Sequence, residues 1–318
     1  MVIEEAERMK KEESILVAIH CLVYNHEPYL RQCLDGFVMQ KTNFRFVAIV
    51  HDDVSTDGSA AIIREYEEKY PDNIKPIYET ENQWHKADGS LGRIMSAAID
   101  ATGAKYVAMC EGDDYWTDPN KLQKQVDFLE SHPDYSMCCH GADVLNQTSN
   151  TIGCGCEKME TREYFPSDAF PTWQIPTASI VYRRDVVEKF QLVREGDFFA
   201  GDVVLILICM HVGRVWGFAD HMSVYRMNKG GFTSHEPTWV ENWVRRKHYE
   251  ALLANFPKLD ADYCHRYIAM LYYTDFRQNK RISSLWTALI HKPSYVLRKI
   301  LRLKSKPRND LFYQHYGC

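Results

Sequence analysis

Short apolar runs alternate with stretches of helical periodicity through the first half of the chain. A strand is predicted at each of four such runs: Ile15–Ile19, Phe46–Val50, Ile74–Tyr78 and Tyr106–Cys110. The first run is almost continuously apolar, which is typical of a strand buried on both faces. Pro76 favours an edge position for the third run, because proline cannot donate to the ladder of a central strand.

Helices are predicted between these strands. Pro28 suits a first helical turn, and the apolar residues after it recur at helical spacing. The segment Ser90–Ala101 also predicts a helix, and Asp118 with Pro119 predicts a capped helix start after the fourth strand. Strands that alternate with helices in this way indicate a largely parallel α/β sheet.

The second half of the chain gives weaker signals. The stretch from Gly141 to Thr172 predicts loops or short strands, and Ala178–Tyr182 predicts one further strand. Beyond Pro237 the pattern is mostly helical. We therefore expect a charged extension (residues 1–13), an α/β domain (residues 14–236) and a helical C-terminal region (residues 237–318).

Composition excludes some classes of function. The 318 residues carry 38 Lys and Arg against 43 Asp and Glu, a formal net charge of −5, which argues against nucleic acid as a partner. The N-terminus lacks the apolar core of a signal peptide, and the longest strongly apolar run, Val203–Met210, is too short to span a bilayer. The ten cysteines show no zinc-site spacing, so free thiols in a reducing cytoplasm are expected.

Three polar turns directly follow predicted strands: Tyr24–Glu27, Asp52–Asp57 and Glu111–Asp114. Ligands of parallel α/β sheets bind at the carboxyl ends of the strands, so the three turns should meet at one crevice. Asp53 stands at a strand end, where it can accept hydrogen bonds from a nucleobase or a ribose. Asp57 and Ser59 are better explained as caps of the next helix.

The turn Glu111–Asp114 places three carboxylates within four residues. Carboxylates this close repel one another unless a cation neutralises them. A hard divalent ion that bridges to substrate phosphates suits such oxygen ligands. A solvated acidic turn ahead of a helix is the alternative that these residues alone leave open.

Together these elements resemble the family-2 glycosyltransferases, over about residues 14–235. The run Ile19–Glu27 with Tyr29-Leu30 resembles the opening strand of the family and its Tyr-Asn-x-Glu turn, and His51–Ser59 resembles its Asp-Asp-Gly-Ser-x-Asp-Gly-Ser element. Glu111–Trp116 resembles its Asp-x-Asp-Asp metal motif. The resemblance implies the GT-A fold, a Rossmann-like, mostly parallel sheet flanked by helices, here with a helical C-terminal extension.

The resemblance also implies how the donor is bound. Arg93 would contact the diphosphate, although an exposed helix residue is the plain alternative. Asp113 would be the principal ligand of Mn²⁺ or Mg²⁺, supported by Glu111 and Asp114. The nucleotide-binding positions that the resemblance implies besides Arg93 and Asp113 are Tyr24, Asn25, Glu27, Asp53 and Gly112.

Gly201-Asp202, followed by an apolar helix, resembles the Glu-Asp pair that supplies the catalytic base in the family. Asp202 would take the proton of the acceptor hydroxyl as that hydroxyl attacks the anomeric carbon. The alternative is that Asp202 only caps the helix. Tyr225-Arg226 with Gly230-Gly231 resembles the stretch that closes over the donor.

Four positions depart from the family pattern. Glu111 stands where Asp is usual, and Val54 stands where Gly is common. Asn228 stands where some relatives carry a metal-binding His, and Gly201 replaces the usual Glu. These departures weaken any inference about metal geometry and about the sugar.

The expected activity is therefore an inverting, metal-dependent transfer of a sugar from a nucleoside diphosphate, UDP by resemblance, to a hydroxyl of a carbohydrate or lipid-linked glycan, as in surface polysaccharide assembly. One alternative is a sugar-phosphate nucleotidylyltransferase, which needs a Gly-rich, basic loop after the first strand, whereas Tyr24–Pro28 contains no glycine. The other is a non-catalytic nucleotide-sugar binding protein, which loss of Asp113 or Asp202 would have favoured.

The C-terminal segment from Lys292 to Arg308 contains seven Lys or Arg and no Asp or Glu. Within it, apolar and basic residues fall on opposite sides of a predicted helix, which can lie in an anionic membrane surface. We therefore expect peripheral contact with the inner face of the membrane. Packing of the apolar side against the catalytic domain is the alternative. The two sets are Val296, Leu297, Ile300 and Leu301, and Arg298, Lys299, Arg302 and Lys304.

Overall fold

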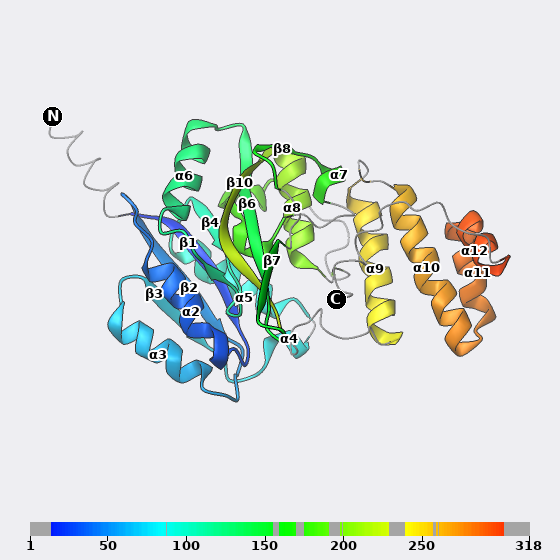
Figure 1. The fold of residues 1–318 in the computed structure, drawn as a ribbon, viewed down its shortest axis with the longest axis horizontal. Helices are drawn as coiled ribbons and strands as arrows, with labels where there is room; N and C mark the ends of the chain where they lie inside the picture. The colour runs from blue at the N-terminus through cyan, green and yellow to red at the C-terminus, as the bar shows by residue number, and fades with distance from the viewer. Residues whose placement is uncertain are drawn as a thin grey trace. The chain divides into compact units, whose positions relative to one another are not determined.

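A computed structural model shows the fold of the chain (Figure 1). It describes residues 14–86, 88–154, 159–169, 175–190, 198, 200–228, 239–256, 259 and 261–301. The predicted extension at residues 1–13, and Gly230-Gly231, lie outside these residues. The chain forms two compact units, the first comprising Met1–Tyr164, Gln174–Phe190 and Ile208–Lys229, and the second Phe165–Trp173, Gln191–Leu207 and Gly230–Cys318.

A mixed sheet of ten strands organises the first unit. Its strands follow the order β3-β2-β1-β4-β9-β6-β10-β5, with β7 paired to β6 and β8 paired to β10. The strands are β1 (Ile15–Val23), β2 (Arg45–Asp52), β3 (Ile74–Tyr78), β4 (Tyr106–Met109), β5 (Tyr115–Trp116), β6 (Tyr135–Asn146), β7 (Thr151–Cys154), β8 (Arg162–Tyr164), β9 (Val181–Arg183) and β10 (Arg214–Met227).

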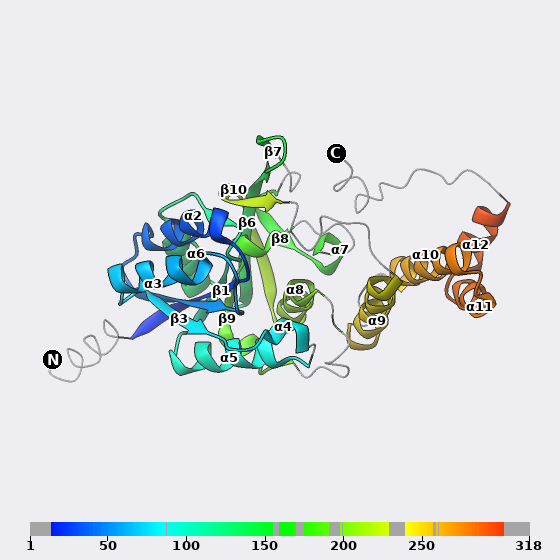
Figure 2. The same cartoon turned by 90° about the horizontal axis from the view of Figure 1, so that it is seen from below.

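The four predicted strands of the first half are confirmed as β1 to β4, which pair in parallel. The strand that contains Pro76 lies at the edge, as predicted. Figure 2 shows α2, α3 and α6 on one face of these strands and α5 on the other. The helices of this part are α2 (Glu27–Val38), α3 (Ser59–Lys69), α4 (Gln83–Lys86), α5 (Ser90–Ala101) and α6 (Lys121–Ser131).

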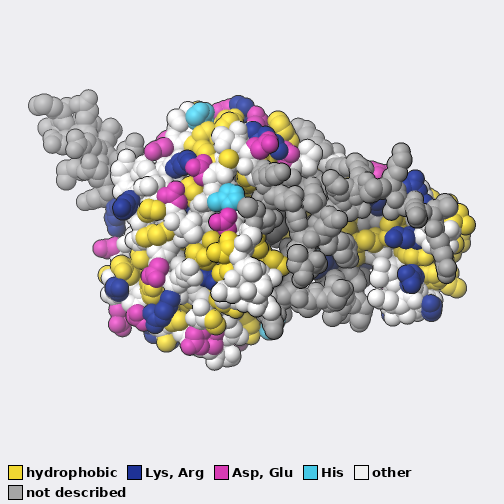
Figure 3. Space-filling model, viewed as in Figure 1, with side chains coloured by type: hydrophobic (Ala, Val, Ile, Leu, Met, Phe, Trp, Pro, Cys, Tyr) yellow, Lys and Arg dark blue, Asp and Glu magenta, His cyan; other side chains and the backbone are white. Residues whose placement is uncertain are grey.

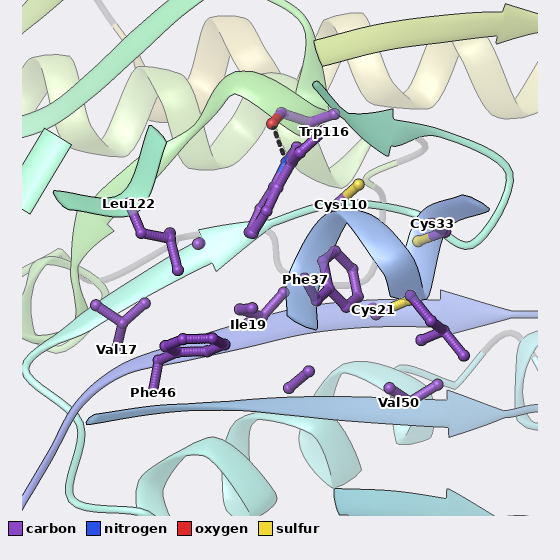
Figure 4. Packing of buried hydrophobic residues seen from close by; sticks show 14 of the residues in the cluster. Val17, Ile19, Cys21, Cys33, Phe37, Phe46, Val50, Cys110, Trp116 and Leu122 are labelled. Carbon is purple, nitrogen blue, oxygen red and sulfur yellow. Dashed lines mark hydrogen bonds between the residues drawn. The ribbon is translucent and has the colours of Figure 1, made fainter. Parts of the chain in front are cut away.

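The hydrophobic core lies between β1, β2 and the helices α2, α3 and α6. Leu30, Leu34 and Phe37 form the buried face of α2, as their spacing predicts. The Phe37 ring meets the Trp116 ring edge to face, with 4.9 Å between centroids (Figure 4). The Trp116 indole N–H donates to the Ala178 carbonyl at 2.8 Å, which satisfies the polar atom of this buried ring.

Several predicted boundaries were wrong. Helix α6 begins at Lys121, because the Asp118 carboxylate accepts from the Asn120 N–H in the preceding turn and does not cap the helix. The stretch from Gly141 contains the short strands β7 and β8, as predicted, but the end of the long strand β6 within it was missed. The predicted strand Ala178–Tyr182 is a 3₁₀ turn (Thr177–Ser179) followed by β9. Strand β10 was not predicted at all.

The remaining segments are helical. The C-terminal helices of the second unit confirm the predicted helical region, and α10, α11 and α12 pack around Ala269, Ala288 and Val296. Within the described residues, no helix combines the length and the apolar character that a membrane crossing requires. The helices are α7 (Pro166–Ala169), the 3₁₀ turn Arg184–Val186, α8 (Gly201–Val212), α9 (Trp239–Asn255), α10 (Ala261–Asn279), α11 (Ile282–His291) and α12 (Pro293–Ile300).

Lys121, the first residue of α6, is an unusual member of the core. Its side chain is fully buried, its ammonium has no hydrogen-bond partner among the described residues, and the nitrogen lies 4.0 Å from the Trp116 ring centroid. Burial lowers the pKa of Lys121 to about 7. The charged form is therefore costly at neutral pH, although the ring face offsets part of the cost.

Replacement of Lys121 by Met should stabilise the protein most below pH 7. In the wild type, the unfolded state holds the Lys121 proton up to about pH 10.5 and the folded state only up to about pH 7. The free energy of unfolding of the wild type should therefore rise relative to that of Lys121→Met, by about 1.4 kcal/mol per pH unit within that window. Urea unfolding of both proteins from pH 6 to pH 9 measures this difference. If the unfolding free energies of the two proteins change with pH in parallel, burial does not lower the pKa of Lys121.

Candidate functional site

The turn after β1 and the loop after β2 are joined by hydrogen bonds in both directions. Backbone amides of the first turn donate to side chains of the second loop, and backbone amides of the second loop donate to side chains of the first turn. Each loop therefore holds the other at the carboxyl end of the sheet. The pairs are Asn25 N to Ser55 Oγ (2.9 Å), His26 N to Ser59 Oγ (2.9 Å), Glu27 N to Asp57 Oδ2 (3.0 Å), Thr56 N to Asn25 Oδ1 (2.7 Å) and Gly58 N to Glu27 Oε2 (2.8 Å).

We call these five reciprocal hydrogen bonds the latch. They change the interpretation of two predicted residues. Asn25 and Glu27 are expected to line a nucleoside pocket, and the structure uses their side chains to bind the neighbouring loop. Asp57 and Ser59, expected to cap α3, accept amides of the first turn as well. The Asp57 carboxylate also accepts from the Ser59 N–H at 2.9 Å, as a cap near the helix start would.

Backbone strain marks the same two loops. Asn25 has φ of 56° and Val54 has φ of 63°, both in the left-handed region. Asparagine tolerates this region, whereas a β-branched residue does so at a cost of about 1–3 kcal/mol. The structure thus gives a reason for the glycine that is common in the family at the position of Val54.

Asp53 is buried and anchors the short helix α4. Its two carboxylate oxygens accept from the Gln83 N–H at 2.6 Å and from the Trp84 N–H at 3.0 Å. A carboxylate offers about four acceptor positions, so Asp53 retains capacity for a ribose or nucleobase donor. Beside it, the exposed Tyr24 ring meets His85 of α4 edge to face.

A buried polar chain supports this anchor. His51 Nε2 lies 3.2 Å from Glu79 Oε1, and the Gln83 side-chain amide donates to Glu79 Oε2 at 3.0 Å. Glu79 thus connects the end of β2 to α4. These supporting residues carry no local sequence signal, because the contact between them depends on the fold.

The acidic turn docks on the end of β1. The Gly112 N–H donates to the Leu22 carbonyl at 2.9 Å, and the Asp53 N–H donates to the Val23 carbonyl at 3.0 Å. A Cβ on Gly112 would lie 2.7 Å from His26 Nδ1 and 3.1 Å from the Leu22 carbonyl oxygen, so only glycine fits. The predicted convergence of the three polar turns is therefore observed.

Two of the three acids bind residues at the end of β10. Asp113 accepts from the Asn228 side-chain amide at 3.0 Å, and the buried Asp114 accepts from the Arg226 N–H at 2.8 Å. Burial raises the pKa of Asp114 well above its usual range, and the neighbouring Asp113 charge adds to the effect. Glu111 is half-buried, and its carbonyl oxygen accepts from the Cys33 thiol at 3.5 Å.

Arg226 supplies a buried positive charge behind this turn. Its guanidinium lies over the rings of Tyr29 and Tyr115, 5.2 and 4.6 Å from their centroids. It donates to Gln147 at 3.3 Å and also to Gln32. Sequence reasoning placed Arg226 in a closing segment and missed its role behind the acidic turn.

His26 was missed as a site residue. It packs on Gly112, and burial lowers the pKa of its imidazole against the opposing charges of Asp113 and Asp57. Its place inside the Tyr24–Glu27 turn was the available signal.

The carboxylate oxygens of the acidic turn suit a divalent ion that takes most of its ligands from a substrate. Among the residues that the structure describes, no three His, Cys, Asp or Glu side chains form a metal cluster. Mg²⁺-type sites need only one or two carboxylates when phosphate oxygens complete the shell. Asp113 is half-buried at the turn, and burial together with the charges of Asp113 and Glu111 raises the pKa of Asp114, so a cation nearby would favour the ionised turn.

The structure places the other two predicted residues on helix starts. Arg93 lies in the first turn of α5, is exposed, and donates to the Asp88 carbonyl at 2.8 Å. Asp202 lies in the first turn of α8, where its Oδ1 accepts from the Val203 N–H at 2.9 Å. The roles of both residues remain predictions.

Polar loops gather at the carboxyl ends of the parallel strands β1, β2 and β4, the edge at which α/β proteins bind their ligands. Comparison with known families is more specific. Residues 19–190, more than half of the chain, match the family model of glycosyl transferase family 2. The chain therefore belongs to glycosyl transferase family 2.

Curated relatives are similar over part of their length. An uncharacterized protein of Mycobacterium tuberculosis is 34% identical over 241 residues, which cover 74% of this chain and 64% of that protein. TuaG of Bacillus subtilis, provisionally named as a teichuronic acid biosynthesis glycosyltransferase, is 30% identical over 201 residues, 57% of this chain and 73% of TuaG. The chain thus spans slightly less than two thirds of the mycobacterial relative.

Solved structures share the fold at low sequence identity. Residues 1–349 of Staphylococcus aureus TarS, in complex with UDP, superpose with a TM-score of 0.60 at 16% identity over 95% of this chain and 89% of that chain. The mannosyltransferase PcManGT of Pyrobaculum calidifontis, in complex with GDP-Man and Mn²⁺, gives 0.55 at 18% identity over 98% and 85%. The predicted GT-A fold is confirmed.

Substitution of Val54 by glycine should stabilise the protein by about 1 kcal/mol, because glycine adopts the observed positive φ without steric cost. Val54→Ala is the matched control: it also removes methyl groups but retains a Cβ, so it should give no comparable gain. Urea unfolding of the wild type and of the two variants measures the difference in the free energy of unfolding. A glycine variant no more stable than the alanine variant would show that the loop carries no strain at this position.

Proposed function

We propose that this protein is an inverting, metal-dependent glycosyltransferase that moves a sugar from a nucleoside diphosphate sugar, a UDP-sugar in the first instance, to an acceptor hydroxyl. The observation that supports it most is the meeting of the latched loops and the acidic turn at the ends of β1, β2 and β4. Family membership and the nucleotide-bound structures of TarS and PcManGT favour the same chemistry.

In this proposal the donor lies across the three turns. Tyr24 and Asp53 contact the nucleoside, with the Asn25 and Glu27 latch holding their loops in place. Arg93 leaves Asp88 for the diphosphate, where its positive charge offsets the charge that develops on the leaving group. Gly112 lets the acidic turn pack closely against the first turn and so holds it beside the donor, since a side chain there would meet His26 and Leu22.

We propose Asp113 as the principal ligand of Mn²⁺ or Mg²⁺, with Glu111 and Asp114 in support and donor phosphate oxygens completing the shell. Such an ion, when bound, stabilises negative charge on the diphosphate. The Asn228 amide orients Asp113, and the Arg226 N–H holds Asp114. These two partners fix the turn while the donor binds.

Asp202 is proposed as the base. The acceptor oxygen forms its bond to the anomeric carbon as the bond from that carbon to the diphosphate oxygen breaks, and the hydroxyl proton passes to the Asp202 carboxylate. One displacement of this kind inverts the anomeric centre. No covalent glycosyl-enzyme intermediate is required.

The proposed acceptor is a carbohydrate or a lipid-linked glycan in surface polysaccharide assembly. The similarity to TuaG, whose name refers to teichuronic acid biosynthesis, supports this class of product. The proposed place of action is the cytoplasm, at the membrane surface where a lipid-linked acceptor would lie.

Asp113→Ala should reduce donor turnover by about 10²-fold or more, because the developing diphosphate charge loses its anchored counter-charge. The thermal shift caused by UDP with Mn²⁺ should also disappear, while the melting temperature without ligand stays near that of the wild type. Asp72→Ala, which removes an exposed acid elsewhere, is the matched control. Full turnover in Asp113→Ala, or in wild type with excess chelator, would refute the metal assignment.

Asp202→Asn should lower transfer by about 10²-fold or more, because an amide cannot take the acceptor proton. The amide oxygen can still accept from the Val203 N–H, so the start of α8 should be preserved. Donor affinity, measured by calorimetry, should change little. If donor affinity is lost and the rate per bound donor is normal, Asp202 belongs to the donor site or to the fold.

A further inference from the structure

Helix α11 presents a line of large apolar side chains on its outer face. Ile282, Trp286 and Ile290 are 67%, 64% and 77% exposed, and their spacing of four residues places them along one side of the helix. The opposite side, with Ser284 and Ala288, is buried in the bundle. The helix is thus apolar on both its inner and its outer side.

Helix α12 also leaves apolar side chains exposed. Of its predicted apolar side, only Val296 is buried, and it packs with Ala269 and Ala288 of the neighbouring helices. Leu297, Ile300 and Leu301 are 49%, 51% and 62% exposed. We call the exposed set Ile282, Trp286, Ile290, Leu297, Ile300 and Leu301 the C-terminal apolar face.

Basic residues are interspersed along the sequence with those of the C-terminal apolar face. The segment from Phe276 to Leu301 contains six basic residues and no Asp or Glu. Figure 3 shows dark blue and yellow side chains together over this part of the second unit. Lys292 pairs with Asp262 of α10, and the Lys299 ammonium lies over the Tyr295 ring. The six are Arg277, Lys280, Arg281, Lys292, Arg298 and Lys299.

The positive charge decides between two possible partners of this surface, a second copy of the chain and a lipid bilayer. A second copy of the chain would bring together two surfaces that each carry an excess of positive charge, and like charges at short range repel. An anionic bilayer matches both features, because apolar side chains enter the boundary of the acyl chains while Lys and Arg contact the headgroups. Trp286 suits this boundary, where tryptophan is enriched in membrane proteins.

We propose that the C-terminal apolar face docks on an anionic lipid bilayer, with Trp286 and Ile290 of α11 entering the interface and Arg298 and Lys299 of α12 contacting headgroups. This proposal assigns specific residues to the membrane contact that is expected for an enzyme with a lipid-linked acceptor. It is independent of catalysis, since no residue of the donor site takes part.

The test is flotation of the full chain with vesicles. Wild type should float with vesicles that contain phosphatidylglycerol at low salt, and not with vesicles of phosphatidylcholine alone or at high salt. Trp286→Glu and Ile290→Glu should each lower partitioning by about tenfold or more. Arg298→Glu/Lys299→Glu should do the same, by at least about tenfold.

Matched controls separate this face from general effects of charge. Ile152→Glu places the same charge on another exposed isoleucine, in β7, and Lys41→Glu/Lys75→Glu makes the same change of net charge on exposed residues of the first unit. Both should float like wild type. Trp286→Phe should abolish the blue shift of tryptophan fluorescence on vesicles if this residue enters the interface.

Three outcomes would overturn the proposal: no flotation of the wild type, equal flotation of the face variants and their controls, or equal binding to neutral and anionic vesicles. A fall in solution mass on Trp286→Glu, without vesicle binding by wild type, would assign the face to a second copy of the chain. Donor hydrolysis in the absence of lipid should be unchanged in Trp286→Glu. A failed flotation assay and a failed glycosyltransferase assignment can therefore be told apart.

Discussion

The reciprocal hydrogen bonds between the turn after β1 and the loop after β2 are the constraint on which the rest of the site depends. Five backbone amides that would otherwise face solvent in irregular loops find side-chain acceptors across this latch. Each bond contributes only about 0.5–1.5 kcal/mol, but together they fix two loops relative to the sheet. The acidic turn is then positioned against the first loop, because Gly112 contacts Leu22 and His26.

The electrostatics of the acidic turn follow from this placement. Its carboxylates meet two uncharged donors, the Asn228 amide and the Arg226 N–H, while the Arg226 guanidinium is held between tyrosine rings and glutamine side chains. Hydrogen bonds of this kind hold the turn in one geometry without neutralising all of its charge. The proposed metal site relies on this remaining negative charge.

The sequence was sufficient for the parallel half of the sheet and insufficient for the rest. Strands β1 and β2 are predicted because continuous apolar runs mark strands buried on both faces. Strand β6 escaped notice because its middle, Cys138–Gly141, has little β-propensity and is buried by its neighbours in the sheet. The order of the motifs located the acidic turn, but Arg226 and Asn228 lie 112 and 115 residues from the acids they bind, a separation that no local pattern can bridge.

The two surfaces proposed for function differ in how strictly the chain specifies them. At the donor end, Gly112 and the left-handed residues Asn25 and Val54 show that backbone geometry is set within narrow limits. The C-terminal apolar face needs only large apolar side chains at helical spacing and a local excess of positive charge. A nucleotide demands directed hydrogen bonds, whereas a bilayer is fluid and accepts any side chain of suitable polarity. The contrast explains why the donor site resembles known motifs residue by residue, while the C-terminal face can be recognised only from its exposure and charge.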